Sequence, residues 1–138
     1  MHKPNLCPCG STQTYERCCE PFHKNLQAPT CEALMRSRYS AFVFGLVDYL
    51  FETTHPSHRS KSLRDEIVFT CKKVAWTKLE VLSTWQGGIN DKVGKVSFCA
   101  FFIQEGKEGS HIEHSRFKQF EKKWFYVDGE VIQDKNLV

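Results

Sequence analysis

Four of the seven cysteines in this 138-residue sequence lie in one short stretch, CPCGSTQTYERCC. They form two close pairs, Cys7 with Cys9 and Cys18 with Cys19. Disulfides explain this spacing poorly, because a bond within either pair closes a small and strained ring. Four thiolates around one tetrahedral zinc ion form a closed structural site, whereas a catalytic zinc ion keeps one position open for water. The spacing therefore predicts a structural Zn²⁺ ion held by all four cysteines.

Two other interpretations of the cysteine stretch stay open. A redox-active site usually has two cysteines separated by two residues at the start of a helix, and the spacing here is different. His23 is a candidate to replace one thiolate, although four cysteines already complete a tetrahedral shell.

The residues around the cysteines also suit a metal site. Gly10 follows the first pair, where a tight turn can require positive φ. Arg17 and Lys24 would help to offset the charge of about −2 on a zinc ion with four thiolates.

The composition is that of an ordinary folded domain. Hydrophobic residues make up 41% and charged residues 25%, and eleven Phe and three Trp supply bulky material for a core. The net charge of +3 is small, and the lysines and arginines are spread along the chain. We therefore expect one compact domain with a small appendage, and the charge does not indicate a nucleic-acid partner.

No stretch of the sequence is typical of a membrane span or a signal peptide. The longest apolar run, FCAFFI at 98–103, is far shorter than the ~20 residues that a spanning helix needs. The first residues, MHKPNLC, contain no apolar stretch. We expect a cytoplasmic location, where the reducing conditions also disfavour disulfides.

Helical patterns follow the cysteine stretch, and strand patterns fill the second half. Thr30 is a candidate N-cap for a helix beginning CEALMRSRYSAFVF, which Gly45 ends or bends. A second helical piece ends at His55, because the residue before a proline is pushed out of helical geometry. A third helix is expected at 63–71, and strands at 76–85, 94–104, 111–121 and 122–129. Helices followed by antiparallel strands predict an α+β fold.

The stretch CPCGSTQTYERCCEPF resembles the SEC-C motif, a small zinc-binding segment also found at the C-terminus of the preprotein translocase motor ATPase. The Cys-Pro-Cys-Gly-Ser start, the aromatic Tyr15 and the closing cysteine pair carry the resemblance. The last ligand of that motif is often His, whereas this sequence has Cys19. The resemblance implies zinc ligation by the same four cysteines that the spacing selects.

The stretches LMRSRYSAFV, YLFETTHPS, GKVSFCAFF, EHSRF and WFYVDG resemble the YchJ-like family of bacterial proteins. The resemblance implies a SEC-C segment at 1–24 and a nuclear transport factor 2-like domain at 25–138. It also implies a cone in which helices pack on a strongly curved antiparallel sheet around a pocket. Many members carry a second SEC-C motif at the C-terminus, which this sequence does not contain, and the family brings no established activity.

The pocket candidates are polar and aromatic residues of the first helix, of the end of the second helical piece and of the strands: Arg36, Arg38, Tyr39, His55, Trp85, Glu113, Ser115, Phe117 and Tyr126. Glu113, Ser115 and Phe117 alternate along one strand and share a face. On a concave face, Glu113 would be either a general base with a raised pKa or the partner of Arg36 or Arg38 in a buried ion pair. His55 is a candidate catalytic residue or, alternatively, a helix-end residue that forms a hydrogen bond with the backbone. His111 and His114 lie on opposite faces and form no metal pair.

Three hypotheses for the function follow. The first is a non-catalytic adaptor or binding module, with a protein partner at the zinc segment and a partner or small apolar ligand in the cone. The second is an enzyme for a small molecule, with acid–base chemistry at Glu113 or His55. The third is association with nucleic acid or the ribosome. An Arg–Glu pair sealing the cavity would favour the first, and a His–Glu pair facing an open cavity the second. A homodimer is a further expectation.

Overall fold

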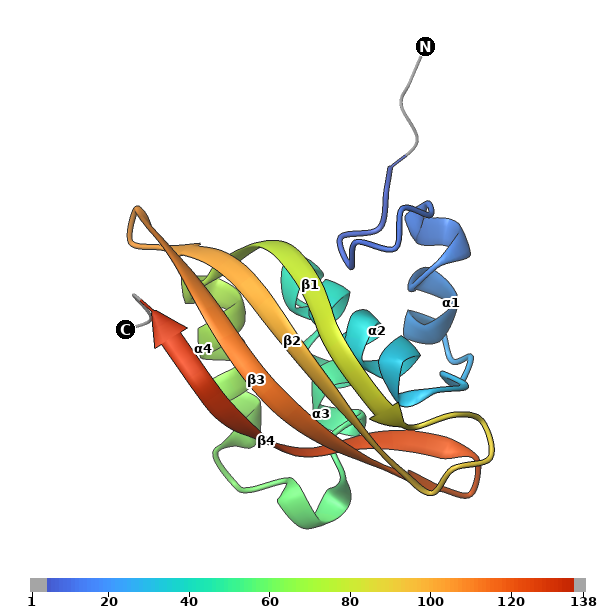
Figure 1. Cartoon of the computed structure of the whole chain (residues 1–138). Coiled ribbons are helices and arrows are strands. Elements are labelled where there is room, and N and C mark those ends of the chain that lie inside the picture. Colours follow the sequence, from blue (N-terminus) through green and yellow to red (C-terminus); the bar gives the residue numbers. More distant parts are fainter. Residues whose placement is uncertain (1–4, 136–138) are drawn as a thin grey trace.

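The computed structural model describes residues 5–135 and contains a curved sheet with helices on one face (Figure 1). The helical elements are the short η1 (Tyr15–Arg17), α1 (Glu20–His23), α2 (Cys31–Phe44), α3 (Val47–Glu52), η2 (Pro56–His58) and α4 (Leu63–Lys73). The strands are β1 (Ala75–Gln86), β2 (Val93–Gln104), β3 (Lys107–Phe120) and β4 (Lys123–Lys135). This order confirms the expected α+β class.

The central helix α2 begins and ends at the predicted residues. The Oγ1 of Thr30 accepts a hydrogen bond from the backbone N–H of Ala33 at 3.1 Å, which caps the first turn. Gly45 ends the helix in the left-handed conformation, with φ of 72°, which glycine adopts without steric penalty. The chain therefore turns sharply into α3, and the two helices are separate elements.

The four strands form an antiparallel meander in the order β1-β2-β3-β4. Two-residue turns join β2 to β3 and β3 to β4. All four turn residues have positive φ, as hairpins with the right-handed twist of a sheet require: Glu105, Gly106, Glu121 and Lys122. Register shifts interrupt the pairing of β1 with β2 and of β3 with β4. Such bulges bend strands, and they accompany the curvature of this sheet.

Helices α2, α3 and α4 lie behind the sheet in Figure 1, and the N-terminal segment lies at one side, next to α2. The main core includes Leu34 and Met35 of α2 together with Trp124 of β4. Cys7, Cys9 and Cys19 belong to the same buried cluster, so the N-terminal segment shares its core with the rest of the fold. A smaller cluster joins α2 to α3 and α4. Among the described residues, no helix has the length and hydropathy needed to cross a membrane.

Candidate metal centre and ligand pocket

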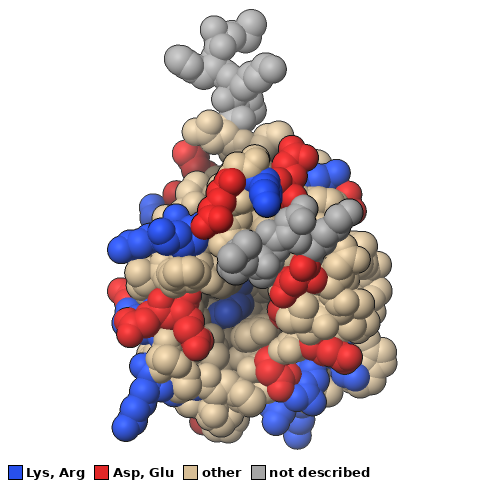
Figure 2. Space-filling view, turned by 90° about the vertical axis from the view of Figure 1, so that its left-hand side faces the viewer, with Lys and Arg blue, Asp and Glu red and all other residues tan. Residues whose placement is uncertain are grey.

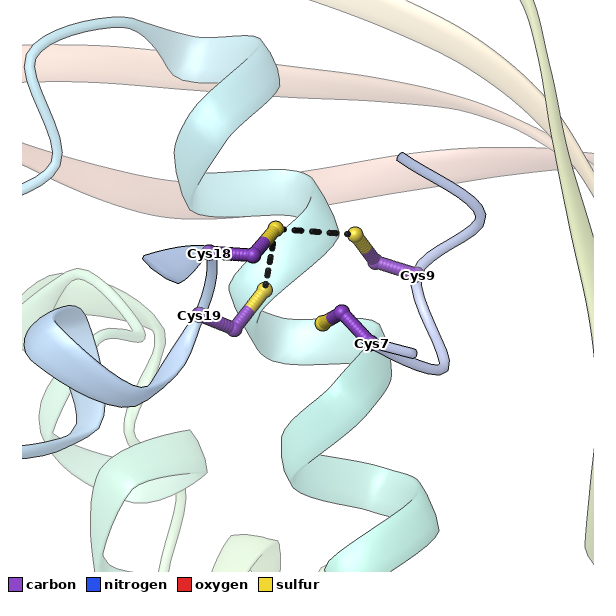
Figure 3. A group of neighbouring side chains, drawn as sticks. All are labelled: Cys7, Cys9, Cys18 and Cys19. Carbon is purple, nitrogen blue, oxygen red and sulfur yellow. Dashed lines mark hydrogen bonds between the residues drawn. The ribbon is translucent and has the colours of Figure 1, made fainter. Parts of the chain in front are cut away.

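The structure brings the four cysteines of the N-terminal segment together (Figure 3). Their sulfurs all lie within 4.8 Å of one another. The Sγ of Cys18 is 3.5 Å from that of Cys9 and 3.9 Å from that of Cys19. Four sulfurs at ~2.3 Å from one tetrahedral ion would be about 3.8 Å apart. The side chains therefore have the arrangement that a four-thiolate metal site requires.

The surroundings of the sulfurs also suit a closed site. Cys7, Cys9 and Cys19 are buried, and Ser11 Oγ lies 3.0 Å from the sulfur of Cys18. Gly10 has φ of 81°, as the tight turn after the first pair requires. A closed, buried shell of this kind is typical of structural metal sites and leaves no coordination position for a substrate.

The thiols of the cluster influence one another's ionisation. Hydrogen bonds from Cys19 and Cys7 lower the pKa of Cys9. Hydrogen bonds to Cys7 and Cys9, together with burial, raise the pKa of Cys19. Thiols this close ionise only in part on their own, because neighbouring thiolates repel each other. A divalent cation removes that repulsion, so its binding would release protons.

Polar contacts hold the N-terminal segment against α2. Arg36 donates from Nη1 to the carbonyl oxygen of Cys9 at 2.7 Å. His23 donates from Nε2 to the carbonyl oxygen of Ser37 at 2.8 Å, and its Nδ1 accepts from the hydroxyl of Tyr15 at 2.6 Å. Burial lowers the pKa of His23, which favours the neutral ring that this pattern needs. His23 therefore serves as a docking residue, and the sulfur of Cys18 completes the cluster of four.

A cavity of about 610 Å³ lies between the helices and the concave face of the sheet. Figure 2 shows a hollow on the side where α4 and the end of β4 lie, with a basic side chain at its floor. Among the described residues that line the cavity, Arg38 is the one arginine or lysine. The aromatic lining residues are Tyr39, Phe42, Phe69, Trp76, Phe98, Phe117 and Tyr126. Its size and lining suit a small organic molecule.

A hydrogen-bond network around Glu113 forms the polar wall of this pocket. Its Oε1 accepts from the Nε2 of His111 at 2.9 Å. Its Oε2 accepts from the hydroxyl of Ser115 at 2.5 Å and from the hydroxyl of Tyr126 at 3.1 Å. The Nδ1 of His111 contacts the carboxylate of Asp134 on β4. The wall is thus a continuous chain of polar groups from the pocket to the outer strand.

The network sets the charges of its members. Burial acts to raise the pKa of Glu113, but hydrogen bonds from His111, Ser115 and Tyr126 hold it below its ordinary value. Burial acts to lower the pKa of His111, but the hydrogen bonds and charges of Glu113 and Asp134 raise it overall. Glu113 is therefore an ionised acceptor. Of the two interpretations of Glu113, the general base with a raised pKa is contradicted, because hydrogen bonds from three donors favour the ionised carboxylate.

Gly129 provides the space that the Glu113 carboxylate occupies. It lies opposite Ser115 in the pairing of β3 with β4. A Cβ atom at position 129 would be 2.1 Å from the Oε2 of Glu113 and 2.4 Å from its Cδ. A side chain at this position is incompatible with the observed carboxylate position.

Arg38 reaches the pocket from α2. Its Nη1 donates to the carbonyl oxygen of Leu50 at 2.8 Å and to the Oγ1 of Thr53 at 2.7 Å. Its guanidinium lies over the ring of Tyr126, 4.5 Å from the centroid. Burial lowers the pKa of Arg38 to about 10, so the group is still charged at neutral pH. The expected ion pair of Arg38 with Glu113 does not form, because Tyr126 lies between them and bonds the carboxylate.

Six of the nine pocket candidates line the cavity: Arg38, Tyr39, Glu113, Ser115, Phe117 and Tyr126. Arg36 does not, because it is two residues from Arg38 and faces the N-terminal segment, where it contacts Glu32 and Cys9. This also excludes it as the partner of Glu113.

The other two candidates lie outside the pocket as well. The Nδ1 of His55 accepts from the backbone N–H of Ser57 at 3.2 Å, so it is the helix-end residue of the alternative interpretation. Trp85 is 51% exposed, and its ring lies 5.2 Å from the Nζ of Lys95.

Sequence reasoning missed His111 and Trp76 as pocket residues. The alternation that places Glu113 and Ser115 on the concave face also places His111 there, so this pattern is the signal that identifies the histidine. It does not pair with His114, which is exposed, as predicted. Trp76 lines the cavity because a register shift between Trp76 and Lys78 turns the tryptophan to the concave face.

The fold and the cysteine cluster together define a class of protein, an NTF2-like domain preceded by a SEC-C motif. The sequence matches the family description "YchJ, middle NTF2-like domain" over residues 30–129 and the SEC-C motif over residues 4–21. The chain belongs to the YchJ (UPF0225) family of proteins.

Curated relatives and solved structures agree with this assignment. The chain is 45% identical to the UPF0225 protein VV1358 of Vibrio vulnificus over 124 residues, which are 89% of this chain and 73% of the relative. It is 45% identical to the UPF0225 protein YchJ of Shigella dysenteriae over 126 residues, 90% of this chain and 82% of the relative.

Two solved structures of SEC-C motif containing proteins have the same fold. The solution structure of RPA3114 from Rhodopseudomonas palustris has a TM-score of 0.83 at 36% identity, covering 92% of this chain and 98% of that chain. A crystal structure of a protein from Psychrobacter arcticus has a TM-score of 0.77 at 28% identity, covering 92% of this chain and 82% of that chain.

Proposed function

We propose that this protein binds a small organic molecule in the pocket of its NTF2-like domain, without chemical conversion. The observation that supports this most is a cavity of about 610 Å³ with aromatic and aliphatic walls and one polar wall around Glu113, the usual design of a small-molecule site. Glu113 does not act as a general base in this proposal, because its three donors stabilise the ionised form and make it a weak proton acceptor.

The proposal includes a zinc ion with a purely structural role in the N-terminal segment. The four sulfurs, their spacing and the burial of three of the cysteines support zinc, which prefers a tetrahedral shell of thiolates. The ion would join the loop at Cys7 to the turn at Cys18 and so present a rigid surface to α2. The predicted protein partner of this segment, the cytoplasmic location and the homodimer stay predictions.

Binding in the pocket can be tested with a neutral fluorescent probe, N-phenyl-1-naphthylamine, whose emission rises in apolar surroundings. Ala100 lines the cavity and is 2% exposed, so Ala100→Phe should fill part of the space and abolish the fluorescence increase. Ser97 lies on the same strand at an odd number of positions away and faces outward, so Ser97→Phe is the matched control. Equal probe binding by both variants would contradict the proposal.

A second candidate function is acid–base catalysis, because a His–Glu pair and not an Arg–Glu pair faces the open cavity. In that case Glu113 or His111 would exchange a proton with the bound molecule. Incubation of the protein with a small-molecule extract of its own cells, followed by mass spectrometry, separates the two candidates. A binding protein would retain one compound unchanged. A catalyst would consume a compound, and the Glu113→Gln variant would leave that compound unconsumed.

A further inference from the structure

We infer that the ligand of this pocket is an organic monoanion, a carboxylate on an apolar body, with the carboxylate bound by Arg38. This inference rests on the proposed binding function and adds the chemical class of the ligand. It follows from the hydrogen bonds that Arg38 makes, from the charges around it and from the apolar walls.

Arg38 uses only one of its three nitrogens within the described part of the chain. Its Nη1 contacts Leu50, Thr53 and Thr54, all of them neutral acceptors. Its Nε and Nη2 have no hydrogen-bond partner among residues 5–135. Neither is sealed in the interior, because the indole Nε1 of Trp76 is the one buried side-chain nitrogen or oxygen without a partner in that part of the chain. Both donors are therefore at least partly accessible, and Arg38 is one of the residues that line the cavity.

The other ionised groups of the pocket wall already have partners of opposite charge. Glu113 bonds to His111, and Asp128 forms an ion pair with Arg116. Arg38 lies within 4.0 Å of no carboxylate among the described residues. Charged groups away from water are usually paired, because desolvation strongly disfavours an isolated charge. A ligand that brings an oxyanion would supply the missing partner, and the guanidinium geometry suits a bidentate carboxylate.

The pocket also limits the rest of the ligand. Arg38 is the one arginine or lysine among the described lining residues, so it can match one negative charge, and a dianion such as a phosphate ester would bring a second charge without a partner. The cavity walls also include Phe42, Phe98 and Phe117, which would bury the apolar surface of a ligand. A carboxylate with an apolar body satisfies both conditions.

The inference is tested by displacement of N-phenyl-1-naphthylamine from the wild-type protein with matched acids and amides. The pairs are 1-naphthaleneacetate with 1-naphthaleneacetamide, and decanoate with decanamide. Each pair shares its apolar body and differs in charge. The carboxylates should displace the probe at concentrations at least about tenfold lower than their amides. Added salt should reduce this preference, because it screens the attraction to the guanidinium.

Three variants locate the effect at one side chain. In Arg38→Gln the ratio between the displacing concentrations of amide and acid should fall to about one. Arg38→Lys should keep part of it, because the charge remains and the planar fork is lost. Arg64→Gln is the control, since Arg64 pairs with Asp48 on the surface and does not line the cavity. If Arg38→Gln does not fold, the acid–amide comparison in the wild type decides the charge of the ligand, and the reduced preference in Arg38→Lys decides whether Arg38 binds it.

The outcomes separate the inference from the binding function on which it rests. Equal displacement by acids and amides would overturn the inference and leave a neutral-ligand pocket. No displacement by any carboxylate below about 1 mM would overturn it as well. A preference that persists in folded Arg38→Gln would also overturn it, because the anion would then bind elsewhere. Failure of the probe itself to bind would overturn the binding function.

Discussion

His111 and Glu113 lie two residues apart on β3, and the imidazole Nε2 donates to the carboxylate at 2.9 Å beside the pocket. Alternation along a strand brings such residues to one face, where side chains at i and i+2 are neighbours. The pair links the pocket to Asp134 on β4, so it contributes to the stability of the sheet edge and sets the charge of the pocket wall.

The first prediction concerns the pH dependence of stability. The pKa of His111 is raised above 6.5, so its stabilisation is complete below pH 6.5 and disappears as the pH rises through the folded-state pKa. The pKa of Glu113 is lowered below 4.5, so its stabilisation is complete above pH 4.5 and disappears as the pH falls through the folded-state pKa. Both stabilising contributions are therefore complete between pH 4.5 and pH 6.5.

His111→Gln should therefore lower the free energy of unfolding by about 2 kcal/mol near pH 5.5 and by clearly less near pH 9, measured by urea denaturation. The matched control is His114→Gln on the outer face of the same strand, which should change little at either pH. A loss for His111→Gln that is the same at both pH values would contradict this account.

The second prediction concerns Gly129. In Gly129→Ala the new Cβ would overlap the Glu113 carboxylate, which must move away from its three donors. Thermal denaturation should show a loss of about 2 kcal/mol. In a Glu113→Ala background the same change should add little, because the overlapping group is absent. Additive effects of the two substitutions would show that Gly129 has another role.

The third prediction concerns the metal centre. Cys9→Ser should abolish stoichiometric zinc and increase amide hydrogen exchange in residues 5–24, because the loop loses its cross-link. Exchange in β2 and β3 should stay slow, since the pairing of these strands does not involve the segment. Cys71→Ser, at a half-buried cysteine outside the cluster, is the control. Complete loss of the circular dichroism signal of helices and sheet in Cys9→Ser would contradict the claim that the metal stabilises only this segment.

Local patterns in the sequence predicted the cysteine cluster and the two ends of α2. The cluster could be predicted because its four cysteines are close in sequence, so a short loop is enough to bring their sulfurs together: Cys7, Cys9, Cys18 and Cys19. The N-cap at Thr30 depends on a hydrogen bond to a residue three positions away. The resemblance to the YchJ-like family supplied the cone, which periodicity alone did not define.

The pocket was harder to predict, because it depends on register and helix rotation. Arg36 and Arg38 differ by about 200° around α2, and nothing in the local pattern indicates which of them faces the sheet. Trp85 follows a second register shift in β1, between Val81 and Ser83, which a simple alternation of faces does not include. The last strand also continues to Lys135, beyond the predicted 122–129, and so brings Asp134 to His111.

The three tryptophans give the most direct test of ligand binding inside the cone. Trp76 lines the cavity, Trp85 is exposed beside Lys95, and the indole of Trp124 donates to the carbonyl oxygen of Pro29 in the core. Each indole N–H gives its own signal in a nitrogen-15 NMR spectrum. On addition of N-phenyl-1-naphthylamine, the account predicts that the Trp76 signal shifts and the other two stay in place. A shift of the Trp85 signal with an unchanged Trp76 signal would contradict it.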